Sequence, residues 1–76
     1  MTLKRHSLSL GGHRTSVAIE DAFWREIQRI AQERNISVAR LVAEVDAARA
    51  GEDPPPNLGS ALRLFVLAEL KARTRG

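Results

Sequence analysis

The side chains best suited to chemistry lie near the start of this 76-residue chain. His6 and His13 could act as bases or metal ligands, but no carboxylate lies near them in the sequence to orient an imidazole. Glu20 and Asp21 are adjacent, and acids at this place fit the start of a helix better than a catalytic pair. Gly11-Gly12 lacks the pattern and the lysine of a phosphate-binding loop. We therefore expect no enzyme, no cofactor and no metal site.

The positive charges of the chain are distributed unevenly along it. Residues 1–19 carry Lys4, Arg5 and Arg14 and no acid, whereas both signs are mixed from Glu20 onward, and the formal net charge is +3. A basic segment that runs into a strand is a plausible surface for phosphate groups. On charge alone, a solvated tail with incidental charges is the better explanation, because three charges are few.

The size and composition of the chain bound its organisation. Seventy-six residues without cysteine predict a single domain over residues 1–76 that has no disulfide or thiolate metal site. A domain this small is marginal alone, and association between copies is a common remedy. Residues 1–12 do not resemble a signal peptide, and the longest apolar run, "LFVLA", is too short to span a membrane. We expect a cytoplasmic protein with no membrane partner.

One strand and two helices are predicted to position the basic residues. In residues 13–19 apolar residues alternate with small or polar ones, which is the period of a strand buried on one face. Helical spacing follows over about 20–34, where Asn35 suits a helix end. Ser37 is a good N-cap for a second helix that ends near residue 50.

The rest of the chain predicts a stiff linker and a third helix. Prolines in "GEDPPPN" cannot continue a helix, so residues 50–57 form an extended linker. Residues 58–76 form a C-terminal helical segment that is helical to about Arg73 and is capped by Asn57 or Ser60. Its "LRLFVLAEL" run is apolar nearly all round, which predicts burial on more than one side.

A lone strand requires a second one, because its backbone groups otherwise lack partners. Gly11-Gly12 permits a two-residue turn, so residues before it could form a hairpin with residues 13–19. Alternatively, residues 13–19 pair antiparallel with the same residues of a second copy about a two-fold axis. Both hold if residues 1–12, otherwise a basic arm, fold back beside that ribbon.

The run "RTSVAIEDAFWREIQRIAQERNISVARLVAEV", within residues 13–49, resembles the ribbon–helix–helix family of Arc- and MetJ-type repressors. The flanking "GHRTS" and "NLGSALRLFVL" resemble a bacterial subfamily known only as ribbon–helix–helix domain proteins. The resemblance implies a mainly α fold with one short β-strand, joined in an intertwined homodimer by an intermolecular two-stranded antiparallel ribbon, plus the third helix. The dimer core would then comprise Val17, Ile19, Phe23, Ile27, Leu41, Val42, Val45, Leu62 and Phe65.

The resemblance also implies double-stranded DNA as a partner and a role in transcription regulation as a repressor. Arg14, Ser16 and Ala18 would face the bases in the major groove, where Arg14 can donate two hydrogen bonds to guanine and Ala18 offers only a methyl group. The start of the second helix and nearby basic residues would hold phosphates; these candidates are Ser37, Val38, Ala39, Arg40, Lys4 and Arg5, with Arg34 in addition.

A protein-interaction module is the alternative function. Antitoxin-like dimers bind a protein partner through a flexible tail, and here the C-terminal helix could dock a partner. The chain ends in an apolar helix and a short "KARTRG" segment instead of a long flexible tail. This favours the DNA-binding regulator over the partner-binding dimer.

Overall fold

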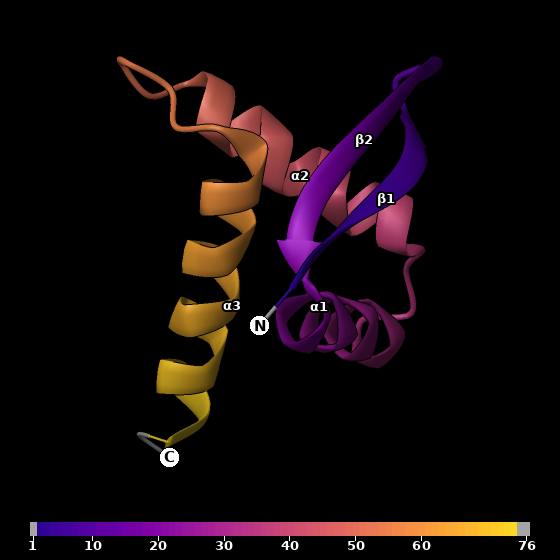
Figure 1. Ribbon diagram of the computed structural model, residues 1–76. Helices are drawn as coiled ribbons and strands as arrows, with labels where there is room; N and C mark the ends of the chain where they lie inside the picture. Colours follow the sequence, from indigo (N-terminus) through magenta and orange to yellow (C-terminus); the bar gives the residue numbers. More distant parts are fainter. Residues whose placement is uncertain (1, 75–76) are drawn as a thin grey trace.

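The computed structural model describes residues 2–74, which form a β-hairpin and three helices (Figure 1). The strands are β1 (Leu3–Leu10) and β2 (His13–Glu20), and the helices are α1 (Asp21–Glu33), α2 (Val38–Ala50) and α3 (Leu58–Thr74). The hairpin lies across α2, its open end meets α1, and α3 stands beside β2. The fold is therefore mainly α, with helices on one face of a two-stranded sheet.

The second strand comes from the same chain. β1 and β2 pair antiparallel in a register that runs from Leu3–Glu20 to Leu10–His13. Gly11 and Gly12 join them with φ angles of 57° and 83°, the positive values that a tight two-residue hairpin turn requires. The expectation of one strand per chain is therefore wrong, and the local hairpin is present. A two-residue loop closes at little entropic cost, so local pairing satisfies the backbone of β2.

The core lies between the inner face of the hairpin and the three helices. Val17 and Ile19 of β2 are buried in one cluster that also contains residues of all three helices. Seven of the nine residues expected in a dimer core are buried within this single chain: Val17, Ile19, Ile27, Leu41, Val42, Val45 and Leu62. Phe23 and Phe65 are half-buried and pack against that cluster. One chain thus builds a core from the predicted residues by itself.

Capping fixes the short connections. Asn35 has a left-handed φ of 57°, and the Asn35 and Ile36 N–H groups donate to Gln32 and Ala31 carbonyls, which closes α1 in a Schellman motif. The Ser37 hydroxyl accepts from the Arg40 N–H at 3.0 Å. Helix α3 is capped by Asn57, whose side-chain oxygen accepts from the backbone N–H that lies three residues later, at 2.8 Å.

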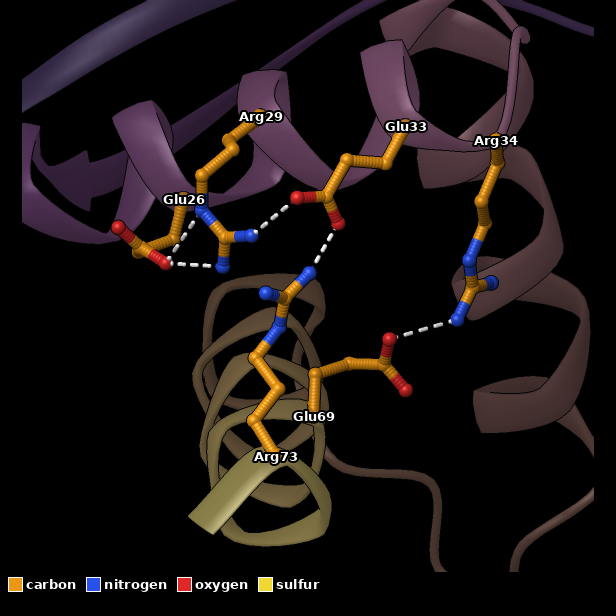
Figure 2. Close-up of polar contacts among 6 residues, drawn as sticks. All are labelled: Glu26, Arg29, Glu33, Arg34, Glu69 and Arg73. Carbon is orange, nitrogen blue, oxygen red and sulfur yellow. Dashed lines mark hydrogen bonds and ion pairs between the residues drawn. The ribbon is translucent and has the colours of Figure 1, made fainter. Parts of the chain in front are cut away.

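Helix α3 is fastened to the rest of the chain by apolar contacts and by three ion pairs. Leu62 and Val66 are fully buried on its inner side. The ion pairs, two of which appear in Figure 2, join Arg63 to Glu20 at 2.8 Å, Arg34 to Glu69 at 2.7 Å, and Arg73 to Glu33. The Glu33 carboxylate is shared with Arg29 of α1, which Glu26 also holds, so a chain of charges runs from α1 to the end of α3.

The outer side of α3 stays open in the single chain. Leu64, Leu67 and Leu70 are 61%, 46% and 39% exposed. The sequence predicted burial on more than one side, and a single chain buries only one. No helix within residues 2–74 combines the length and the apolar character that spanning a membrane would take.

Candidate nucleic-acid interface

The solvent-facing side of the hairpin gathers six small or basic side chains. In the register of the sheet, Arg5 lies opposite Ala18, Ser7 opposite Ser16, and Ser9 opposite Arg14. All six are exposed, whereas their neighbours on the other side of the sheet pack toward the helices. We call this surface the outer face: Arg5, Ser7, Ser9, Arg14, Ser16 and Ala18. The alternation in residues 13–19 predicted its β2 half, and the serines of "HSLSL" are the signal for the β1 half.

The outer face is positively charged and its arginines are free. Arg5 and Arg14 make no ion pair with any residue of the described chain, and the Glu20 carboxylate, which the register places on the same side at the end of β2, is paired with Arg63. Seven other basic side chains in residues 2–74 are paired with acids: Lys4, Arg29, Arg34, Arg40, Arg49, Arg63 and Arg73. Two unpaired guanidinium groups among serine hydroxyls form a surface suited to anionic ligands.

The other basic candidates have acidic neighbours. Lys4 lies on the inner side of β1, and its Nζ is 3.0 Å from Asp21. Arg40 lies 3.5 Å from Glu44, and Arg34 pairs with Glu69. Exposed pairs of this kind are weak and can exchange partners, but in this arrangement none of these three cations belongs to the outer face.

The N-terminus of α2 retains donors for an anion. Ser37 already caps the Arg40 N–H, while the Val38 and Ala39 N–H groups belong to the first turn and have no partner inside the helix. Helix α2 begins on the β1 side of the hairpin and runs behind it toward α3 (Figure 1). These donors therefore lie on the flank of the hairpin that β1 forms.

One edge of β2 is not paired within the chain. The pair Leu10–His13 closes the turn, and in such a hairpin the closing pair exchanges hydrogen bonds across the ladder. Alternation along the ladder then directs the backbone groups of Arg14, Ser16 and Ala18 away from β1. These three residues offer N–H and C=O groups for a further strand.

The first turn of α3 covers part of that edge. A Cβ atom placed on Gly59 would lie 3.2 Å from the Ala18 carbonyl oxygen, so only glycine allows this close approach without a shift. A hollow of about 390 Å³ remains beside it, between Ser16 and Ala18 of the sheet and Leu58 and Arg63 of α3. The edge is open at Arg14 and Ser16 and covered at Ala18.

Arg63 of α3 holds the first turns of this helix against the end of β2. Its Nε donates to the Glu20 carboxylate at 2.8 Å, and this hydrogen bond lowers the pKa of Glu20 below its usual 4.5. The pair joins the end of β2 to α3 and stabilises the ionised form of the Glu20 carboxyl group. Sequence patterns gave no sign of this pair, because its partners lie far apart in the chain.

Comparison with known proteins places the chain in a family. A family model described as a ribbon-helix-helix domain matches residues 3–70. The chain belongs to the ribbon-helix-helix family. No curated protein and no solved structure matches it. The match begins at the first residue of β1 and ends within α3, so both elements are part of the ribbon-helix-helix unit here. Domains of this family are generally DNA-binding transcription regulators, typically dimeric and typically non-enzymatic.

Proposed function

We propose that this ribbon-helix-helix protein binds double-stranded DNA sequence-specifically as a homodimer and represses transcription in the cytoplasm of a bacterium. The observation that supports this most is the outer face, where Arg5 and Arg14 are unpaired and lie among the small side chains of Ser7, Ser9, Ser16 and Ala18. It lies beside a strand edge whose backbone groups lack a partner strand. A DNA-binding ribbon needs both features together.

The dimer forms through the open edge of β2. Two copies related by a two-fold axis pair residues 13–19 antiparallel, with Ser16 facing Ser16 of the partner subunit at the axis. The result is an intermolecular ribbon with β1 on each outer side, so the hairpin and the ribbon coexist. A partner N–H must come within about 2.9 Å of the Ala18 oxygen, which is the space beside Gly59. The first turn of α3 therefore moves aside when the ribbon extends to Ala18.

The paired β2 strands enter the major groove with their outer side chains toward the bases. Arg14 donates two hydrogen bonds to guanine O6 and N7, Ser16 donates or accepts, and Ala18 contacts a thymine methyl group. The backbone donors of Val38 and Ala39 at the start of α2 bind phosphates on each side. Ala18 contributes little specificity, so much of the affinity comes from phosphates and falls steeply with salt.

Selection of bound duplexes from a random DNA pool tests this function. We expect recovery of a short palindromic motif, because a two-fold dimer reads two equal half-sites. Arg14→Ala should lose the preference at the base pair it reads, at a cost of about 1–3 kcal/mol. Arg25→Ala is the matched control, since Arg25 is an exposed arginine of α1 without an ion pair among the described residues. Equal base preference in the wild type and Arg14→Ala would refute the proposed contact.

Binding of a protein partner is the second candidate function. An apolar groove of about 370 Å³ lies between α2 and α3, lined by Leu41, Val45, Ala61 and Phe65 among others. It adjoins the exposed Leu64 of α3. This function is favoured if the purified chain aggregates alone and shows no affinity for any duplex at low salt.

A further inference from the structure

We propose that β1 is a phosphate-binding element in which Arg5, Ser7 and Ser9 grip the DNA backbone on both sides of the reading strands. The inference rests on the proposed DNA-binding ribbon and extends it to residues outside β2. Its basis is the register that places these three side chains on the same outer face as Arg14, Ser16 and Ala18.

Strand spacing determines where β1 meets the DNA. Neighbouring strands lie about 4.8 Å apart, so the outermost strands of the sheet β1–β2 with its two-fold copy are about 14 Å apart. The major groove of B-DNA is about 12 Å wide. The central β2 pair fits between the groove walls, whereas each β1 lies over a wall. The walls consist of phosphates, so β1 contacts phosphates and not base edges.

The side chains of β1 suit that position. Ser7 and Ser9 are short, which lets the phosphate ridge approach the strand closely, and their hydroxyl groups donate hydrogen bonds to phosphate oxygens. Arg5 supplies a charge that no acid among the described residues neutralises, in a fork that matches phosphate geometry. The free N–H groups at the start of α2 lie on the same flank, so both anchors act on one backbone.

Lys4 offers a matched contrast to Arg5. It is the next residue along β1 and carries the same charge, but it faces the inner side and pairs with Asp21 at 3.0 Å. Removal of either side chain changes the net charge of the protein equally. Only Arg5 is on the surface that we place against DNA, so the two substitutions separate a contact from a change in overall charge.

The test is the salt dependence of duplex binding, measured for the duplex selected by the wild type and for an unrelated duplex. Arg5→Ala should reduce the slope of log K against log salt by about 1.8 for both duplexes, which is two phosphate contacts per dimer. Lys4→Ala should leave the slope close to that of the wild type, and Arg5→Lys should restore it. Ser7→Ala combined with Ser9→Ala should weaken binding to both duplexes at least about threefold. Melting temperatures confirm that each variant is folded.

Three results would overturn the inference. The first is an Arg5→Ala slope equal to that of the wild type. The second is an equal loss of slope in Lys4→Ala, which would mean that overall charge governs binding. The third is a changed base preference in Arg5→Ala, which would place Arg5 inside the groove. Failure of the wild type to bind any duplex at low salt is a different outcome, since it refutes the proposed function itself.

Discussion

Substitution of Ser16 by proline should weaken the dimer while it leaves the fold of the single chain intact. The backbone N–H and C=O groups of Ser16 point away from β1, and those of Ser7, directly opposite, point away from β2. Proline lacks the N–H donor and is tolerated in strands where that donor faces solvent. Ser16→Pro should therefore leave the hairpin of each chain formed, while it removes a donor that a partner strand would use.

The size of the effect follows from the two-fold pairing. With Ser16 at the axis, the two Ser16 residues exchange two hydrogen bonds, and Ser16→Pro removes both donors. Each net hydrogen bond contributes about 0.5–1.5 kcal/mol, so the dimer loses about 1–3 kcal/mol, and its dissociation constant rises about 5- to 150-fold. The steric bulk of the proline ring against the partner strand adds to this loss.

Sedimentation equilibrium over a concentration series measures that constant. Ser7→Pro is the control, because it makes the same change at the opposite position of the sheet, on the edge of β1 that the ribbon does not use. Its dimer should match the wild type. Equal dissociation constants for Ser16→Pro and the wild type would show that the dimer does not form through β2. Equal weakening by both prolines would show instead that the substitutions damage the hairpin.

Two further predictions concern the stability of the single chain. His6 stacks on Trp24 with ring centroids 4.2 Å apart, and its buried Nε2 has no hydrogen-bond partner among the described residues. His6→Phe should keep the stacking and remove the cost of burying this unpaired nitrogen, about 1–3 kcal/mol, so the melting temperature should rise by several degrees. A lower melting temperature would contradict this account. Because Arg63 lowers the pKa of Glu20, the ionised form favours the folded chain above the unfolded pKa of about 4.5, and this stability is lost as the pH falls through the lower folded value. Melting curves between pH 3 and pH 6 should therefore show a steeper acid loss for the wild type than for Arg63→Met, and parallel curves would exclude the pair as its source.

Local signals in the sequence predicted most elements of the fold. The α2 and α3 starts and the left-handed Asn35 each depend on neighbouring residues alone, and the structure confirms them. The turn at Gly11-Gly12 was only one of two alternatives that the sequence left open, and the structure shows that it forms. β1 was harder to predict because its inner side carries Lys4 and His6 where a buried strand normally has apolar residues. His6 takes that place by stacking on Trp24, a contact between elements that no periodicity reveals.

The candidate site divides in the same way. The alternation in β2 predicted which of its side chains face outward, and the structure places Arg14, Ser16 and Ala18 there. Charge alone could not distinguish Lys4 from Arg5, because only the pairing register assigns adjacent residues of β1 to opposite sides. The approach of Gly59 to the Ala18 carbonyl depends on how α3 returns to the sheet, and no local pattern in the sequence specifies it.

The close fit of Gly59 against Ala18 has a consequence for the newly made chain. An uncovered strand edge can pair with strands of other chains, which leads to aggregation. Here the first turn of α3 covers part of the β2 edge in the single chain, at Ala18. Pairing of β2 with a second copy has to displace this turn, so we expect the chain to stay monomeric at low concentration.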